Sequence, residues 1–184
     1  MRSEEAMDQK KQKRTGLGLF ILTLVLIAAA LGYFLLARPG AKSETGDLTC
    51  TVSISCASIL DHMELCKAEK QALVPADGWI LQPVEAAFTE GESVFDVLQR
   101  VCRENKIHME FTDTPLYQSA YIEGIANLYE FDCGEVSGWM YKVNDWFPNY
   151  GCSRYQLKDG DVIEWVYTCD LGKDVGGDYW NKSE

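Results

Sequence analysis

The longest hydrophobic pattern in the chain is an uncharged stretch of 23 residues, 15–37. A helix of that length, at about 1.5 Å per residue, crosses a bilayer core of about 30 Å. Five lysines and arginines precede the stretch within residues 1–14, and only Arg38 and Lys42 follow it closely. The positive-inside rule therefore predicts a single-pass transmembrane helix with a cytoplasmic tail, residues 1–14, and with the rest of the chain outside the cell.

A cleaved secretory signal is the alternative interpretation of this segment. The apolar region of such a signal is normally about 7–15 residues long and ends at a cleavage site of small residues. Here the run is longer, and the residues before Arg38 are Leu35, Leu36 and Ala37, which form a poor cleavage site. The pattern favours an uncleaved membrane anchor.

Beyond a linker at residues 38–46, the hydrophobic pattern becomes that of a folded domain, which we expect to span residues 47–171. Between residues 48 and 56, apolar side chains and cysteines alternate with Thr and Ser, as in a half-buried strand. Further strands are predicted at 84–88, 107–111, 121–131 and 162–168. A glycine-rich tail at residues 172–184 is expected to be loose.

The clearest helical pattern begins at Ser93. Ser93 is the expected N-cap, and Asp96 stands at the third helical position, as in a capping box. The apolar positions then recur at helical spacing and form one face, which comprises Val94, Val97, Leu98, Val101 and Cys102. A shorter helix is predicted at 58–70. One principal helix with four to six strands describes an α+β domain, not a doubly wound parallel one.

The segment that follows residue 138 contains a hairpin signal. Asn144 and Asp145 lie between two aromatic segments, 139–141 and 146–147. Both residue types tolerate left-handed backbone angles, which two-residue hairpin turns require. We therefore predict a tight turn at Asn144–Asp145.

Composition and charge exclude several classes of function. The chain has 17 basic and 28 acidic residues and a net charge of −11, which disfavours binding to nucleic acids. Its two histidines, His62 and His108, are isolated, and no hydrolase, metalloprotease or phosphate-loop motif occurs. The acidic turn at residues 159–161 offers too few oxygen ligands for calcium. We expect no enzymatic activity and no metal site.

All seven cysteines lie beyond the predicted anchor, as expected for a domain in an oxidising compartment. No two of them form a C-x-x-C pair, which argues against a metal or thioredoxin-like site. Spacing does not define the connectivity, and the odd number leaves at least one thiol unpaired or shared between two molecules. We predict Cys66 as the free thiol, because it lies on an apolar stripe with Ile59 and Met63. The disulfide candidates are Cys50, Cys56, Cys102, Cys133, Cys152 and Cys169.

Two segments resemble a known family. The sequence GWMYKVNDWFPNYGCSRYQLKDGDVIEWVYT, residues 138–168, and the upstream EGESVFDVLQRVC, residues 90–102, resemble the transcobalamin-like C-terminal domain. This family of bacterial surface domains of unknown function is named for its similarity to the last domain of vitamin B12 carriers. The resemblance implies a β-grasp-like fold, a mixed sheet carrying one helix, displayed outside the cell. In the animal carriers the corrinoid is held between such a domain and a helical barrel, and this chain contains no such barrel.

Apart from the family resemblance, the one indication of function in the sequence is a cluster of aromatic residues. Six of them crowd around the predicted hairpin and its exit, and these ligand-binding candidates are Trp139, Tyr141, Trp146, Phe147, Tyr150 and Tyr155. Alternation places Trp139 and Tyr141 toward the interior of the sheet, whereas the residues at and after the turn are harder to bury. Flat rings with polar tips suit a sugar, a corrinoid or another protein.

These observations lead to one hypothesis and one alternative. The hypothesis is a membrane-anchored extracellular binding module that captures a small molecule, with cobalamin as the candidate ligand and no resident cofactor. The alternative is an adaptor subunit that docks a protein partner at the cell surface without binding a small molecule itself.

Overall fold

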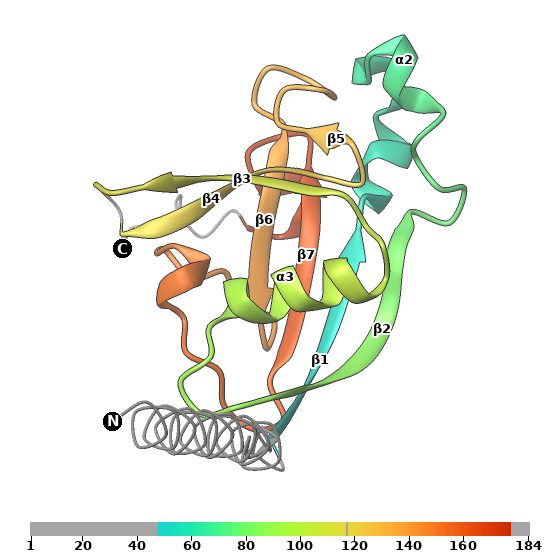
Figure 1. Ribbon diagram of the computed structural model, residues 1–184. Coiled ribbons are helices and arrows are strands. Elements are labelled where there is room, and N and C mark those ends of the chain that lie inside the picture. Colours follow the sequence, from blue (N-terminus) through green and yellow to red (C-terminus); the bar gives the residue numbers. More distant parts are fainter. Residues whose placement is uncertain (1–47, 117, 178–184) are drawn as a thin grey trace, which may run out of the picture. The chain divides into compact units, whose positions relative to one another are not determined.

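The computed structural model describes residues 48–116 and 118–177, which form an α+β domain (Figure 1). No helix within these residues is long and apolar enough to cross a bilayer. The predicted anchor at residues 15–37 and the linker at residues 38–46 lie outside the described residues.

The main sheet has four strands in the order β2-β1-β7-β6. Strands β1 and β7 are parallel, and the two outer pairs are antiparallel, so the sheet is mixed, as predicted. Its strands are β1 (Leu48–Ser55), β2 (Trp79–Phe88), β6 (Gly138–Val143) and β7 (Val162–Thr168). Strand β2 begins well before residue 84, the predicted start, because the turn at Pro75–Gly78 ends the preceding segment earlier than expected.

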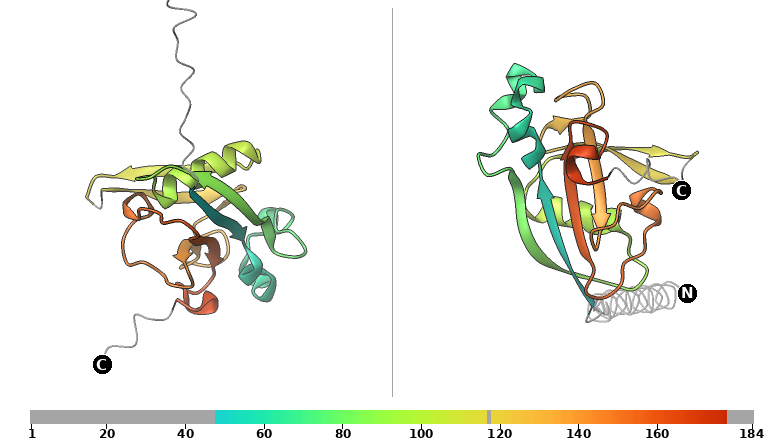
Figure 2. Two further views of the ribbon diagram at one scale, coloured as in Figure 1. Left: turned by 90° about the horizontal axis from the view of Figure 1, so that it is seen from below. Right: turned by 180° about the vertical axis from the view of Figure 1, so that it is seen from behind.

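In addition to the mixed sheet that the resemblance implied, the domain has a second, antiparallel sheet. Its strands are β3 (Met109–Thr114), β4 (Ser119–Ile125) and β5 (Leu128–Tyr129), in that order. The strand predicted over 121–131 is divided by a tight turn, because Ala126 and Asn127 both have positive φ angles of 53° and 62°. The second sheet lies on the same face of the main sheet as the principal helix (Figure 2).

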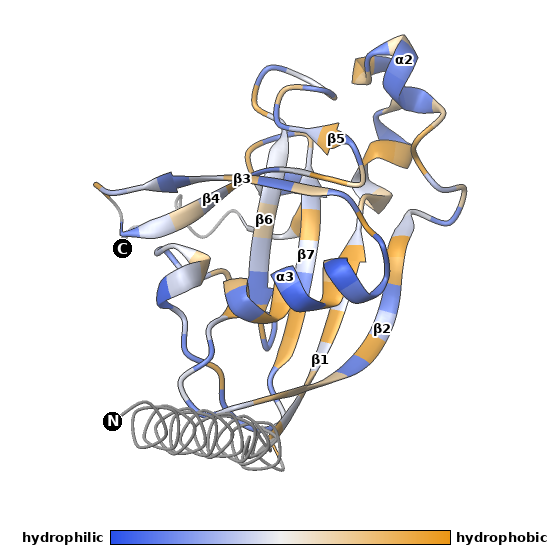
Figure 3. Ribbon diagram, viewed as in Figure 1, coloured by the Kyte–Doolittle hydropathy of each residue, from blue (hydrophilic) through white to orange (hydrophobic). Residues whose placement is uncertain are grey.

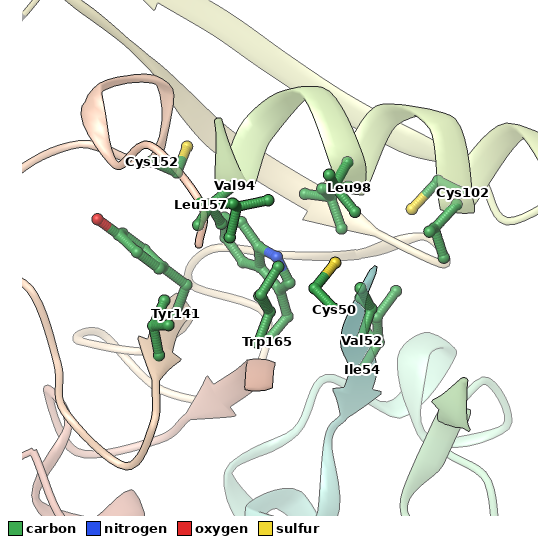
Figure 4. Packing of buried hydrophobic residues seen from close by; sticks show 14 of the residues in the cluster. Cys50, Val52, Ile54, Val94, Leu98, Cys102, Tyr141, Cys152, Leu157 and Trp165 are labelled. Carbon is green, nitrogen blue, oxygen red and sulfur yellow. The ribbon is translucent and has the colours of Figure 1, made fainter. Parts of the chain in front are cut away.

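That helix, α3 (Val94–Glu104), begins as predicted. The Ser93 side chain accepts a hydrogen bond from the Asp96 backbone N–H, and the Asp96 carboxylate accepts one from the Ser93 backbone N–H, which completes the capping box. All five apolar positions of its predicted face are buried: Val94, Val97, Leu98, Val101 and Cys102. Figure 3 shows that hydrophobic and hydrophilic residues alternate along α3. Figure 4 shows Val94, Leu98 and Cys102 of its apolar face packed near Cys50, Val52 and Ile54 of β1.

The helix predicted over 58–70 is wrong as a single element. The chain instead forms two short 3-10 turns, η1 (Ala57–Asp61) and η2 (Met63–Leu65), and one turn of α-helix, α2 (Ala68–Gln71). Two other 3-10 turns follow later, η3 (Cys152–Arg154) and η4 (Lys173–Val175). Turn η4 lies where we expected the loose tail, and Asp174 fixes it by accepting a hydrogen bond from the Cys169 backbone N–H at 2.7 Å.

All seven cysteine side chains are buried. They are divided between two hydrophobic clusters. Cys50, Cys102 and Cys152 lie in the core beneath α3, and the other four lie in a smaller cluster at the opposite end of the main sheet.

Candidate functional site

The predicted turn at Asn144–Asp145 is confirmed, and it defines one side of the candidate site. The two residues have φ angles of 52° and 63°. Val143 and Trp146 exchange backbone hydrogen bonds of 2.9 and 3.1 Å across the turn, as in a two-residue hairpin. The pairing ends there, because the strand opposite β6 is β7 and not residues 146–147. Trp146 therefore leaves the sheet, and 48% of its surface is exposed.

The segment after the hairpin contains η3 and two further tyrosines, of which Tyr150 lies beside Trp146. Tyr150 lies before η3 and is 37% exposed, and Tyr155 caps its C-terminal end and is half-buried. Their rings stack with centroids 6.0 Å apart and planes at 13°. Trp146 meets Tyr150 edge to face at 6.1 Å.

The rings continue inward to the core. Tyr155 contacts Tyr141 edge to face at 6.4 Å, and Tyr141 lies 5.5 Å from Trp165. Tyr141 is 9% exposed and Trp165 is 2% exposed. Figure 4 shows Tyr141 and Trp165 side by side beneath α3, with the Tyr141 hydroxyl pointing away from Trp165. We refer to the five rings as the aromatic ladder, which in order from the surface comprises Trp146, Tyr150, Tyr155, Tyr141 and Trp165.

A single hydrogen bond ties the exposed half of the ladder to the buried half. The Tyr141 hydroxyl donates to the Tyr150 backbone carbonyl at 2.8 Å. Burial raises the pKa of Tyr141, and burial together with the negative charge of Asp161 raises the pKa of Tyr155. Both phenols therefore remain protonated donors at physiological pH, and neither is an activated acid or base.

Four of the six predicted ligand candidates belong to the ladder, and two do not. Trp139 lies further along β6, where its indole N–H donates to the Leu128 carbonyl at 2.8 Å and its ring meets Tyr167 edge to face at 5.2 Å. Phe147 was predicted to be exposed near the turn, but it is 7% exposed, because the hairpin pairing ends at Trp146 and the chain turns back toward the core. Trp165, in the strand predicted over 162–168, completes the ladder.

Charges around the hairpin are paired within the domain. Lys142 lies 2.8 Å from Glu164 and 3.4 Å from Asp145. Burial opposes the charge of Lys142, but these two carboxylates outweigh it and raise the pKa of the lysine. The Asn144 side chain donates to the buried Asp161 carboxylate at 2.8 Å and accepts from the Val162 backbone N–H at 2.9 Å. The exposed rings are thus presented by a rigid turn that carries no unpaired cation of its own.

The domain also has two shallow hollows outside the ladder. One, of about 250 Å³, lies between the β3–β4 hairpin and η3 and is lined by Asp113, Gln118 and Ser153 among others. The second, of about 320 Å³, lies between β7, η1 and η4. Enclosed sites for drug-sized ligands range from about 300 to 1,000 Å³. The two hollows are therefore near or below the lower end of this range, and neither is lined by a ring of the aromatic ladder. No group of His, Cys, Asp and Glu side chains suited to a metal ion occurs among the residues that the structure describes.

Residues 91–169, which include α3 and the whole ladder, match a family described as a domain of unknown function (DUF4430). No curated protein matches the sequence. Among solved structures, haptocorrin in complex with Cbi is similar with a TM-score of 0.45 and 13% identity, over 66% of this chain and 25% of haptocorrin. A candidate metal-binding protein from Ruminococcus gnavus ATCC 29149 is similar with a TM-score of 0.41 and 16% identity, over 66% of this chain and 97% of that one. The present chain thus covers about a quarter of the length of haptocorrin.

Proposed function

Because the chain carries a domain of the transcobalamin-like C-terminal family, whose function is unknown, we propose that it is a binding module that captures a small ligand on Trp146 and Tyr150. The observation that carries this proposal is the aromatic ladder. Its outer rings are exposed, whereas its inner rings are fixed in the core.

The ladder supports binding because its exposed rings are held in place before a ligand arrives. Tyr150 is fixed by stacking on Tyr155 and, through its carbonyl, by the Tyr141 hydroxyl. Ordering a mobile side chain at an interface costs about 0.5–1.5 kcal/mol, and a ring that is already fixed avoids much of this cost. Exposed Trp and Tyr rings also offer large apolar area together with a polar tip.

The surface favours a ligand with a flat or apolar face and without a large negative charge. The lysine of the hairpin, Lys142, is paired with Glu164 and Asp145. The chain also has a net charge of −11, which disfavours anionic ligands. A corrinoid, as the family resemblance implies, or a glycan has such a face. Since the hollows are small, the ligand would keep one side open to solvent or to a second protein.

We further propose that residues 15–37 anchor the module in the membrane, with the domain outside the cell. The uncharged length of that segment and the basic residues before it support the proposal. N-terminal sequencing of protein from purified membranes tests it. We expect an N-terminus before residue 15, and one at or beyond Arg38 would refute the anchor.

The binding proposal is tested by titrating the purified full-length chain, in a mild detergent, with cobalamin and related corrinoids. Tryptophan quenching, corrected for absorbance, reports binding, and calorimetry checks the signal. We expect saturable binding that Trp146→Ala weakens by about tenfold or more, as for a central aromatic contact. Phe131→Ala is the matched control, because this ring is also exposed but lies on the loop after β5, away from the hairpin. An equal loss in both variants would contradict a site on the ladder.

No binding up to about 1 mM would limit the binding free energy to less than about 4 kcal/mol in magnitude and reject these ligands. The adaptor function would then be favoured, because exposed Trp and Tyr residues are also typical of protein interfaces. Chemical cross-linking in intact cells distinguishes the two functions. A stoichiometric protein adduct that Trp146→Ala abolishes supports the adaptor, and its absence supports direct ligand capture.

A further inference from the structure

Two cysteines that are far apart in sequence, Cys66 and Cys133, face each other at the end of the domain opposite the hairpin. Their residues form an isolated antiparallel bridge. The two Sγ atoms lie 2.7 Å apart, and both side chains are buried. Cys66 directly follows η2, and Cys133 lies in the loop between β5 and β6.

The backbone at this bridge has the geometry that a disulfide needs. The Lys67 N–H donates to the Asp132 carbonyl at 2.9 Å, one residue beyond the cysteines on each side. Cys66 and Cys133 are therefore a non-hydrogen-bonded antiparallel pair, in which the Cα atoms are about 4.5 Å apart and the side chains approach closely. Disulfides span Cα distances of about 4.4–6.8 Å. Formation of the bond therefore requires only a small adjustment of the two side chains and no movement of the backbone.

The segment that contains Cys66, residues 63–71, makes few other contacts that fix its position. None of the residues of η2 or α2 is buried, and the hydrophobic contacts of residues 63–71 with the smaller cluster come from Cys66 and from the partly buried Met63. Ion pairs with Asp132 also hold this segment in position. The Asp132 carboxylate lies 3.0 Å from the Lys67 ammonium and 3.1 Å from the Lys70 ammonium. Cys66 is the buried residue between the two turns, and its partner is adjacent to Asp132.

We propose that Cys66 and Cys133 are a modification site, at which the two thiols are oxidised to a disulfide that fastens the η2–α2 segment to the loop after β5. The oxidant is a disulfide, either of a small molecule or of a thiol oxidoreductase. One cysteine thiolate attacks a sulfur of the oxidant, which forms a mixed disulfide and releases one oxidant thiol. The second cysteine attacks the mixed disulfide, which forms the protein disulfide and releases the other thiol. The protein loses two protons and two electrons, and the electrons reduce the oxidant to two thiols.

The exchange must take place while the chain folds. Burial raises the pKa of the Cys133 thiol, and the neighbouring Cys66 raises it further, which disfavours the Cys133 thiolate in the folded domain. A dissolved oxidant has no access to either sulfur in the folded state. Once formed, the bond is protected from reductants for the same reason.

A disulfide at Cys66 differs from the sequence-based prediction that this cysteine is the free thiol. The expectation rested on an apolar stripe of a helix over 58–70, and that helix is broken into η1, η2 and α2. Cys66 consequently lies in an extended position that faces Cys133. Cys56 and Cys169 occupy the same buried cluster and are the competing partners.

Disulfide mapping of the full-length protein tests the proposal without any variant. The protein is purified without reductant from an oxidising compartment, its free thiols are alkylated in denaturant, and it is digested with trypsin and a glutamate-specific protease. Cleavage after Glu64 and Lys67 gives the fragment 65–67, and cleavage after Glu130 and Glu135 gives the fragment 131–135. We expect these two fragments joined, two hydrogens lighter than the sum of the reduced pair. Alkylated Cys66 or Cys133 as the main product, or either one joined to Cys56 or Cys169, would overturn the assignment.

A stability measurement gives a second, independent readout. Cys66→Ala, Cys133→Ala and the double variant should each lower the Tm of the oxidised protein by the same amount, on the order of 10 °C for a loop of this length. Reduction in denaturant, followed by refolding with the reductant present, should lower the Tm of the native protein more than that of the double variant by this same amount. Cys102→Ala, a buried cysteine of the other cluster, is the control and should leave this difference unchanged. Equal reductant sensitivity of the native protein and the double variant would contradict the bond.

Discussion

Tyr150 and Tyr155 stack with their ring planes only 13° apart, although the 3-10 turn η3 separates them in the chain. This contact joins the exposed end of the aromatic ladder to the buried end. The stack therefore serves two purposes, since it stabilises the segment after the hairpin and it orients a ring that faces solvent. The two effects can be measured separately, because stability and ligand binding have different readouts.

We predict a measurable coupling between these two tyrosines. Tyr150→Ala, Tyr155→Ala and the double variant form a double-mutant cycle, followed by urea unfolding at pH 7. Aromatic pairs of this kind are worth about 0.5–1.5 kcal/mol beyond their buried area, so the double variant should lose less than the sum of the single variants by that amount. Strict additivity would show that the stack contributes nothing to the free energy of unfolding.

Substitutions at the two ends of the ladder should lower the free energy of unfolding by very different amounts. Trp165→Ala removes a ring from the core and should lower the free energy of unfolding by about 3–5 kcal/mol. Trp146→Ala removes a half-exposed ring and should cost less than about 1 kcal/mol. Chemical denaturation of both variants measures this difference. A large loss in Trp146→Ala would identify that ring as a structural element and would weaken its assignment to ligand binding.

Local signals predicted the parts of the fold that depend on local chemistry. The Ser93–Asp96 capping box and the Asn144–Asp145 turn are set by hydrogen bonds and backbone angles within a few residues, and both were predicted correctly. The helix over 58–70 was wrong, because its apolar residues are buried by strand β7 and by a distant loop and not along one helical face. Its apolar spacing alone could not show this.

The candidate site was predicted in part, for a similar reason. The sequence identified the aromatic residues around the hairpin, since they are close in the chain. It could not show that Trp139 turns to the Leu128 carbonyl, or that Tyr155 stacks on Tyr150, because both contacts depend on where the β5 loop and η3 meet the sheet. The pairing of Cys66 with Cys133 has the same origin, since it depends on an antiparallel bridge across 67 positions of sequence.

Close backbone packing at the start of β2 gives a further prediction. Gly78 has a φ of +73°, and a Cβ added there would lie 2.5 Å from the Ala57 Cα atom. Gly160 has a φ of +80°, and nothing lies within 4 Å of its added Cβ. Alanine at either position is strained by about 1 kcal/mol because of its backbone angle. Overpacking against Ala57 should lower the free energy of unfolding of Gly78→Ala by about 1–3 kcal/mol more. Gly160→Ala should not show this additional loss. Urea unfolding of the two variants tests this, and equal losses would show that Ala57 moves aside without cost.

The buried carboxylate of Asp132 should make the stability of the domain depend on pH. Burial disfavours its ionised form, but the hydrogen bond from the Tyr129 backbone N–H and the ion pairs with Lys67 and Lys70 outweigh burial and lower its pKa. An unfolded Asp has a pKa of about 3.9. Because the folded pKa lies below this value, the stabilisation is complete above about pH 5 and is lost as the pH falls through 3.9 toward the folded pKa.

Asp132→Asn should therefore cost about 2 kcal/mol at pH 7, as expected for the loss of charged hydrogen bonds. The difference between the native protein and the variant should shrink as the pH falls from 5 to 3, since the native carboxylate then becomes neutral as well. Urea unfolding at pH 7, 5, 4 and 3 measures both effects. Asp145→Asn is the matched control, because the Asp145 side chain is 91% exposed and its ion pair with Lys142 should contribute little at any pH. A difference for Asp132→Asn that stays constant over the whole series would show that the cost of the substitution comes from packing and not from the charge.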